Sequence, residues 1–272
     1  MSLVSTDWLA NNLEQVKIID SSWHMPSTNR NAYEEYKKEH IKNAIFFDID
    51  KYSNEKTELP HMLPDEKEWE KIVSNLGISN EDKIIVYDNS DVISSCRCWY
   101  TFIFFGHKPN LISVLNGGLL KWKKENREIT NKTLNYKTKI YKAKKISNLV
   151  KTKKEIDKNI SQKKFKVVDA RSKNRFLGLE KEPRTGVRSG SIKNSYCLPF
   201  GQLINLENKT FLEKNKIKEK FAEIGINNEN NVVFSCGSGI TAAVLSLAYS
   251  MINDKYLPKI YDGSWAEYGR VK

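Results

Sequence analysis

Four short motifs from the first half of the chain recur in the same order in the second half. Each pair is separated by 146 to 151 residues, which is about half of the 272-residue chain. The pairs are Lys17-Ile-Ile-Asp20 with Lys166-Val-Val-Asp169, His40-Ile-Lys-Asn43 with Ser191-Ile-Lys-Asn194, Ile84-Ile-Val-Tyr-Asp88 with Val232-Val-Phe-Ser-Cys236, and Asn116-Gly117 with Asp262-Gly263. One such match could arise by chance, but four in one order indicate a tandem duplication with small insertions.

Each copy alternates β-branched runs with segments of helical periodicity. In the first half we expect helices over residues 2–13, 30–40 and 95–105, with Ser5 or Thr6 as the first N-cap, and strands over 17–20, 83–88 and 111–115. This alternation predicts an α/β fold with a mostly parallel sheet flanked by helices in each domain. From about residue 125 the alternation of strand-like and helical segments ends, and the sequence becomes rich in Lys, Asn and Thr. We therefore expect domains over 1–130 and 146–272 and a linker over 131–145.

Cys236 stands between a predicted strand and a predicted helix. The apolar run 232–234 leads into it, and a strongly apolar segment with helical period follows from Ala242. Backbone N–H groups of such a turn and the positive end of the helix dipole stabilise a thiolate, the nucleophilic form of cysteine. Gly237 and Gly239 are expected to supply backbone angles that other residues resist. The alternative is a structural, buried cysteine, but the strand, Cys-Gly-x-Gly and helix context favours a nucleophile.

The residues around the cysteine argue against a phosphatase. A cysteine phosphatase needs an arginine six positions after the thiolate to hold the phosphoryl oxygens, and position 242 is alanine. Between Cys236 and Lys255 there is no Lys or Arg. A monoanionic substrate whose charge is held elsewhere fits this loop better.

The segment Cys236-Gly-Ser-Gly-Ile-Thr241-Ala resembles the active-site loop of the 3-mercaptopyruvate sulfurtransferases, which are members of the rhodanese superfamily. The resemblance implies two tandem rhodanese-like domains and a catalytic Cys236 in the second. It also implies that the loop residues bind the substrate, with Ser238 taking part in catalysis. These loop residues are Gly237, Ser238, Gly239, Ile240 and Thr241. Thiosulfate-preferring rhodaneses usually carry basic residues in this loop, so its neutral sequence favours 3-mercaptopyruvate as the sulfur donor.

The first domain is expected to be catalytically silent. Asp88 occupies the position in the first repeat that Cys236 occupies in the second. Aspartate cannot carry a sulfur atom, and the tandem rhodaneses likewise have their reactive cysteine in the second domain.

Two arginines are candidates for binding the substrate carboxylate. A guanidinium group presents a fork of donors that matches two carboxylate oxygens. Alone, the segment 175–184 could be solvated surface charge, but its Arg-Phe-x-Gly and Glu-Pro-Arg pattern resembles a motif of the same family. The resemblance implies that Arg175 and Arg184 hold the α-keto carboxylate of mercaptopyruvate.

His61 is the candidate for proton transfer. A lone histidine before an apolar stretch is more often a capping or packing residue. However, His61-Met-Leu-Pro64 resembles a family segment that has an aspartate eleven residues earlier, a spacing that Asp50 meets. The resemblance implies an Asp50, His61 and Ser238 relay, in which Asp50 fixes the imidazole tautomer and His61 polarises the hydroxyl. Asp48 remains an alternative to Asp50.

Composition limits the remaining possibilities. The net charge of +12 is spread along the chain without a concentrated basic stripe, so we expect no nucleic acid. A basic surface that attracts small anions is one alternative, but plain compositional bias is the simpler explanation of this charge. The small anionic sulfur donor is expected from the family resemblance. The apolar run 99–105 is too short to span a bilayer, and the N-terminus lacks a secretory pattern, so we expect a cytoplasmic protein without membrane contact. Four cysteines, including Cys96-x-Cys98, match neither a disulfide framework nor zinc-ligand spacing. We expect no metal and no cofactor.

The predicted activity is transfer of sulfane sulfur from 3-mercaptopyruvate through a Cys236 persulfide, with release of pyruvate. By family resemblance the acceptor is a thiol such as that of thioredoxin, or cyanide. Two alternatives remain open at this point. One is a thiosulfate:cyanide sulfurtransferase, and the other is a non-catalytic rhodanese-like binding module.

Overall fold

Contacts divide the computed structural model, which describes residues 2–271, into two units. The first unit comprises the chain up to Glu55, Leu63–Ile146 and Leu206–Thr210. The second comprises Lys56–Met62, Ser147–Asn205 and the chain from Phe211 onward. Two short segments, 56–62 and 206–210, thus fold with the opposite half of the chain, an exchange that the sequence did not indicate.

The first unit is built on a parallel five-stranded sheet in the order β1-β6-β5-β2-β4. Its strands are β1 (Leu3–Val4), β2 (Lys17–Asp20), β4 (Ala44–Phe46), β5 (Ile84–Tyr87) and β6 (Ile112–Leu115). A second, antiparallel pair joins β3 (His40–Ile41) to β7 (Ile129–Thr130).

The expected helix over residues 2–13 is wrong at both ends. Leu3 and Val4 form an edge strand paired with Val114 and Leu115, because pairing with a buried neighbour outweighs the local helical pattern. Helix α1 covers only Thr6–Ala10, and Ser5 is its N-cap, with the side chain accepting a hydrogen bond from the Trp8 N–H.

Helices cover both faces of the first sheet. The flanking helices are α1, α2 (Ala32–Lys38), α3 (Glu66–Asn75), α4 (Ser95–Phe104) and α5 (Gly118–Lys124). Leu9 of α1 and Trp122 of α5 pack with Ile18 and Ile85 on one face. On α3 and α4, the rings of Trp69 and Phe102 meet edge to face at 5.0 Å.

The second unit repeats this architecture. Its sheet has the order β10-β9-β11-β12-β8, again parallel throughout. The strands are β8 (Val150–Lys151), β9 (Lys166–Asp169), β10 (Tyr196–Cys197), β11 (Val232–Ser235) and β12 (Ile260–Tyr261). The helices are α6 (Lys153–Gln162), α7 (Lys173–Leu177), α8 (Lys214–Glu223), α9 (Ile240–Ile252) and α10 (Ser264–Tyr268), and short 3-10 turns of the chain cover Pro26–Thr28, Pro109–Leu111, Ser147–Leu149 and Phe200–Leu203.

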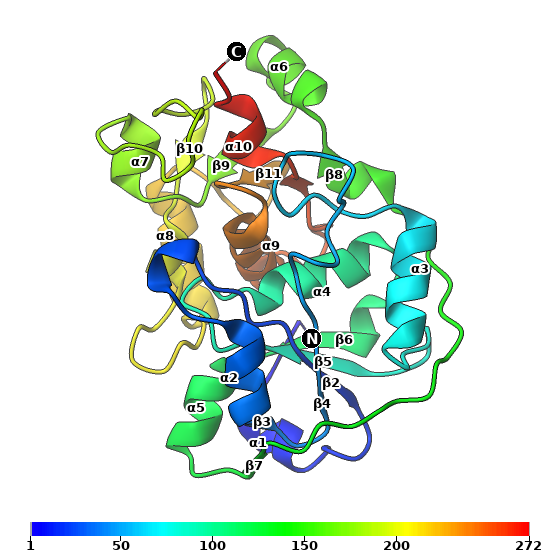
Figure 1. Ribbon diagram of the computed structural model, residues 1–272. Coiled ribbons are helices and arrows are strands. Elements are labelled where there is room, and N and C mark those ends of the chain that lie inside the picture. Colours follow the sequence, from blue (N-terminus) through cyan, green and yellow to red (C-terminus); the bar gives the residue numbers. More distant parts are fainter. Residues whose placement is uncertain (1, 272) are drawn as a thin grey trace. The chain divides into compact units, whose positions relative to one another are not determined.

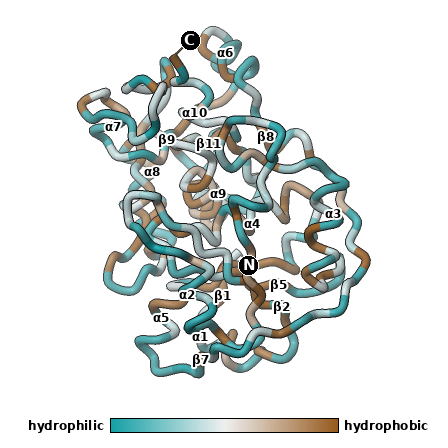
Figure 2. Tube along the Cα trace, in the orientation of Figure 1, coloured by the Kyte–Doolittle hydropathy of each residue, from teal (hydrophilic) through white to brown (hydrophobic). Residues whose placement is uncertain are grey.

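Successive side chains of β11 point to opposite faces of the second sheet. Val233 packs with Ile156 of α6 and Trp265 of α10 on one side. Phe234 contacts Phe221 of α8 and Tyr249 of α9 on the other. Helix α9 follows β11 after the loop 236–239 (Figure 1) and is apolar along its length (Figure 2), because it is buried almost all round.

Strand register confirms the duplication. In the first unit Ile19 pairs with Ile45, and in the second their repeat counterparts Val168 and Tyr196 pair in the same way. Two tandem α/β domains with mostly parallel sheets, as the sequence predicted, are therefore confirmed.

The segment expected to be a linker, 131–145, contains no helix or strand and packs on the first unit. Tyr141 is buried there, and the Tyr136 hydroxyl donates a hydrogen bond to the Asn43 carbonyl at 2.7 Å. Across residues 2–271, we find no helix that combines the length and apolar character needed to cross a bilayer.

Candidate active site

The Cys236 thiol lies where β11 gives way to α9. Gly239 is the N-cap of α9 with φ of +84°, and its N–H points at the Cys236 sulfur, with N and Sγ 3.1 Å apart. A backbone donor therefore contacts the sulfur at the N-terminus of a 13-residue helix. Both features favour negative charge on that atom. Ile240 and Thr241 form the first turn of the helix behind it.

Helix α10 holds the same loop from the other side. The Cys236 N–H donates to Ser264 Oγ at 3.1 Å, and the N–H groups of Trp265 and Ala266 donate to the carbonyls of Cys236 and Gly237 at 2.9 and 2.8 Å. These bonds fix the backbone on which the thiol is carried.

Ser264 is a site residue that the sequence reasoning missed. Its φ is +49°, a left-handed angle that is uncommon outside glycine, and its repeat counterpart Gly118 has φ of +53°. A serine at a position where the other repeat has glycine was the available signal. The strained angle places the Ser264 hydroxyl against the Cys236 N–H.

The two glycines of the loop differ in backbone conformation. Its φ is not in the left-handed region, so the predicted need for special backbone angles is wrong for Gly237 and holds only for Gly239. A β-carbon added at Gly237 would lie 3.3 Å from Arg175 Nη2 and 3.6 Å from Arg184 Nη1. Both guanidinium groups thus approach the residue that follows the thiol, and glycine leaves them room.

A buried network holds Arg175 in place. Arg175 donates from Nε and Nη2 to the two carboxylate oxygens of Glu182 at 3.2 and 2.5 Å. Glu182 also accepts from Arg171 Nη1 at 2.7 Å, and Arg171 in turn pairs with Asp169 at the end of β9. Burial lowers the pKa of Arg171, but its hydrogen bonds to Asp169 and its pairing with Glu182 raise it overall. No sequence pattern assigned these roles to Arg171 or to Glu182.

Arg184, Ser238 and His61 are linked in a row by hydrogen bonds. Arg184 Nη2 donates to Ser238 Oγ at 3.2 Å, and Ser238 Oγ lies 2.9 Å from His61 Nδ1. Because Arg184 donates to the oxygen, the Ser238 proton can be donated to the imidazole. His61 has φ of +60° and belongs to the exchanged segment 56–62 of the second unit.

Asp50 and Asp48 both belong to the first unit. Asp50 Oδ2 accepts a hydrogen bond from Trp23 Nε1 at 2.9 Å, and Asp48 Oδ1 accepts from the Lys51 N–H at 3.1 Å. The partnership of either carboxylate with His61 stays a prediction.

In the first repeat, the loop equivalent to the one after Cys236 donates hydrogen bonds to the carboxylate of Asp88. Asp88 Oδ1 accepts from the Ser90 N–H at 2.8 Å and Oδ2 accepts from the Ser95 N–H at 2.9 Å. Burial raises the pKa of Asp88. The Asp88 carboxylate is thus held by backbone N–H groups of its own loop and of the start of α4.

Burial disfavours the thiolate form of the other three cysteines. Burial raises the pKa of Cys96 and of Cys98 well above the usual range, and raises that of Cys197 to about 11. Among the described residues, no cluster of three or more His, Cys, Asp or Glu could hold a metal ion.

Comparison with known proteins identifies the family. The model of the rhodanese-like domain matches residues 5–125 and again 152–270. The chain therefore belongs to the rhodanese family and contains two tandem copies of its domain.

Relatives with this architecture are sulfurtransferases. The chain is 37% identical to thiosulfate/3-mercaptopyruvate sulfurtransferase 1, mitochondrial, of Arabidopsis thaliana, over 98% of this chain and 75% of the relative. It is 34% identical to the 3-mercaptopyruvate sulfurtransferase of Mus musculus (98% and 91% covered) and 34% identical to the thiosulfate sulfurtransferase of Rattus norvegicus (99% and 92% covered). The crystal structure of SseA from Escherichia coli, a 3-mercaptopyruvate sulfotransferase, superposes with a TM-score of 0.87 at 28% identity, covering 97% of this chain and 99% of SseA. This chain is an enzyme of the same type, a tandem-domain sulfurtransferase.

Proposed function

We propose that this enzyme takes sulfur from 3-mercaptopyruvate onto Cys236 as a persulfide, releases pyruvate, and passes the sulfur to a thiol or to cyanide. The observation that carries the proposal is the approach of Arg175 and Arg184 to Gly237, directly beside the thiol. This arrangement suits a substrate that presents a carboxylate to the arginines and a sulfur atom to the cysteine.

In the proposed mechanism the Cys236 thiolate attacks the mercaptopyruvate sulfur. A sulfur–sulfur bond forms and the carbon–sulfur bond breaks, so its electron pair passes to carbon as the enolate of pyruvate. The proton of the substrate thiol is relayed through Ser238 and His61 to the enolate carbon, with Asp50 orienting the imidazole. The persulfide anion remains on Cys236, where the Gly239 N–H and the helix terminus favour its charge.

Local charge supports mercaptopyruvate over thiosulfate. Arg171 and Arg175 are paired with Asp169 and Glu182, and the loop that follows Cys236 contains no Lys or Arg. A neutral loop suits the single carboxylate of mercaptopyruvate better than dianionic thiosulfate. Thiosulfate remains the second candidate donor, because curated relatives carry its name. The ratio of kcat/KM for the two donors tests this preference.

In the second step a thiol such as that of thioredoxin, or cyanide, attacks the outer sulfur and returns the Cys236 thiolate. We also propose that the first domain is catalytically silent, since Asp88 replaces the cysteine there. A cytoplasmic location is proposed as well. One curated relative is named as mitochondrial, so cell fractionation with compartment markers is the appropriate test.

Mass spectrometry tests the proposal directly. After incubation with 3-mercaptopyruvate and removal of excess donor, the peptide that contains Cys236 should gain the mass of one sulfur atom. Pyruvate should be released in equal amount. Cys236→Ser should abolish both, whereas Cys197→Ser, which removes a thiol of raised pKa in the same unit, should retain both. Pyruvate release by Cys236→Ser would dismiss the mechanism.

Alkylation with iodoacetamide separates the enzyme from a non-catalytic binding module. In a binding module Cys236 should be inert and should not be alkylated under native conditions. The sulfurtransferase predicts rapid alkylation of Cys236 that mercaptopyruvate prevents.

A further inference from the structure

The first unit contains a pocket of about 250 Å³ at the carboxyl end of β2. Asp20, the last residue of β2, lines this pocket and is 2% exposed. Residues of helix α2, of the loop after β5 and of helix α5 form its walls. The volume is smaller than that of drug-sized sites, so the pocket suits a ligand of a few heavy atoms.

In the second unit the guanidinium group of Arg171 is bound at the end of the equivalent strand, β9. Its Nη2 donates to Asp169 Oδ2 and to the Gly190 carbonyl, both at 2.7 Å, and its Nη1 donates to Glu182 Oε1 at 2.7 Å. The group also lies over the Trp265 ring, 4.5 Å from the ring centroid. The second unit thus contains a complete binding site for a guanidinium cation, which its own side chain fills.

Repeat counterparts of these residues line the pocket of the first unit. Ser22 stands where the second unit has Arg171. The other counterparts are Asp20 for Asp169, Glu39 for Gly190 and Leu119 for Trp265. Serine has no guanidinium group and leucine is smaller than an indole, so these two replacements leave the space open.

A glutamate in the first unit also takes the role of Glu182. Arg30 donates from Nε and Nη2 to the two carboxylate oxygens of Glu35, at 2.7 Å each, as Arg175 does to Glu182. In the second unit Glu182 Oε1 accepts a further hydrogen bond from Arg171. Within residues 2–271 the donor to Glu35 Oε1 is Arg30 Nε alone, and the Glu35 side chain is 32% exposed. This oxygen can therefore accept from a second guanidinium group in the pocket.

Asp20 is a buried carboxylate without a cationic partner. It accepts hydrogen bonds from the Ser22 N–H at 2.9 Å, from the Ser22 hydroxyl at 2.6 Å and from the Tyr87 hydroxyl. Among the described residues no Lys, Arg or His pairs with it, and burial raises its pKa to about 6, so it is ionised at pH 7. Lys38 also lines the pocket but is exposed, so its ammonium group extends into water. The charge of Asp20 therefore favours a cationic ligand.

We propose that this pocket binds a small alkylguanidinium cation. The guanidinium group would donate to Glu35 Oε1 and lie against Asp20, as Arg171 does with Glu182 and Asp169 in the second unit. The site is independent of the reaction proposed at Cys236.

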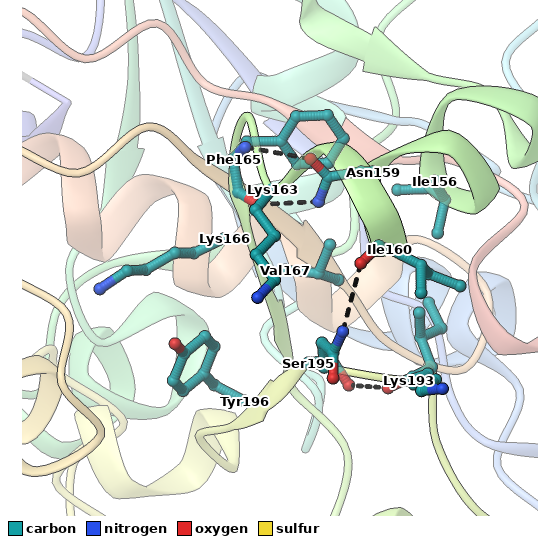
Figure 3. A pocket seen from close by; sticks show the side chains of 12 residues that line it. Ile156, Asn159, Ile160, Lys163, Phe165, Lys166, Val167, Lys193, Ser195 and Tyr196 are labelled. Carbon is teal, nitrogen blue, oxygen red and sulfur yellow. Dashed lines mark hydrogen bonds between the residues drawn. The ribbon is translucent and has the colours of Figure 1, made fainter.

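One cation is expected to bind to each chain. In the second unit Arg171 itself fills the equivalent place. A larger pocket of that unit, of about 500 Å³, has Lys163, Lys166 and Lys193 around it (Figure 3). These lysines should repel a cation, so this second pocket should not compete for the ligand.

Isothermal titration calorimetry with methylguanidinium chloride at constant ionic strength tests the site, and neutral methylurea, which has a similar shape, serves as the control ligand. The intact enzyme should bind methylguanidinium saturably, with one per chain, and should not bind methylurea. Ser22→Arg supplies the side chain of the second unit, so it should weaken binding at least tenfold while the melting temperature does not fall. Ser27→Arg adds the same charge at an exposed position of the same unit and should bind as the parent does.

A second variant tests the carboxylate without filling the pocket. Glu35→Gln keeps the shape of the side chain but removes its charge, and should also weaken binding at least tenfold. Glu34→Gln makes the same change at an exposed neighbouring position of α2 and should have no effect. The proposal is overturned if the parent shows no saturable binding at millimolar ligand, if methylurea binds equally well, or if Glu35→Gln binds as the parent does. It is also overturned if Ser27→Arg weakens binding as much as Ser22→Arg.

Discussion

Arg184 donates a hydrogen bond from Nη2 to the Ser238 hydroxyl oxygen at 3.2 Å. The pair joins the group proposed to bind the substrate carboxylate to the group proposed to move its proton. A substrate that engages Arg184 would therefore alter the orientation of the Ser238 hydroxyl in the same event. In the proposed mechanism, substrate binding and proton transfer would therefore be coupled through this hydrogen bond.

Removing the charge of Arg184 should weaken substrate binding. Arg184→Gln is expected to raise KM for 3-mercaptopyruvate by about 10- to 100-fold, since a hydrogen bond to a charged group contributes about 1.5–3 kcal/mol. Arg184→Lys keeps the charge but loses the two-pronged donor geometry of guanidinium, so its KM should lie between those of the parent and Arg184→Gln. Steady-state pyruvate release measures both, with Arg270→Gln, an exposed arginine of the same unit, as control. A fall in kcat with KM unchanged would contradict this role.

His61 and Ser238 should act as one unit. His61→Asn is a suitable replacement because asparagine tolerates the left-handed backbone of this position. Each single variant, His61→Asn or Ser238→Ala, should lower kcat by about 100-fold. Since the two groups are in contact at 2.9 Å, the double variant should be little worse than either single one. Multiplicative losses in this double-mutant cycle would exclude a shared relay.

Alanine substitutions of the two loop glycines should have different effects on KM and on stability. Gly237→Ala places a methyl group 3.3 Å from the Arg175 guanidinium, so KM should rise while the free energy of unfolding changes by less than about 0.5 kcal/mol. Gly239→Ala forces a side chain into φ of +84° and should cost about 1–2 kcal/mol of stability. Urea denaturation and donor kinetics on both variants distinguish them. The reverse pattern would mean that backbone angles, and not space for the arginines, explain Gly237.

Asp20 should make the stability of the enzyme depend on pH. Burial raises the pKa of this carboxyl from 3.8 to about 6, against the opposing effect of its hydrogen bonds from Ser22. The folded chain thus holds a proton that the unfolded chain has lost, so stability falls as pH rises from about 4 to about 6 and the cost remains above that. Asp20→Asn cannot ionise.

The stability of the Asp20→Asn variant relative to the parent should therefore increase by up to about 3 kcal/mol between pH 4 and pH 7. Urea denaturation of both proteins across this range provides the measurement. A difference between the two that stays constant with pH would show that Asp20 does not titrate in this way.

Much of the fold was predictable because strong local patterns coincide with the repeat. The run Ile84–Tyr87 is fully buried in mid-sheet, and such β-branched runs have few other uses. The strand Leu3–Val4 could not be predicted, since two residues carry no period and their pairing depends on Val114 and Leu115 far along the chain.

The site was predictable only in part. The motif loop indicated Cys236 and Ser238, but which carboxylate holds Arg175 depends on how a seven-residue turn folds back, and spacing does not reveal that Glu182 does so. The role of Gly237 depends on two side chains from another segment, so no local pattern could indicate it.

The exchange of segment 56–62 has a consequence for producing the second half of the chain alone. A protein that started at residue 146 would contain the nucleophile and both arginines but would lack His61, which the first half of the sequence encodes. Supplying residues 56–62 as a separate peptide would be the only way to return the imidazole to such a fragment.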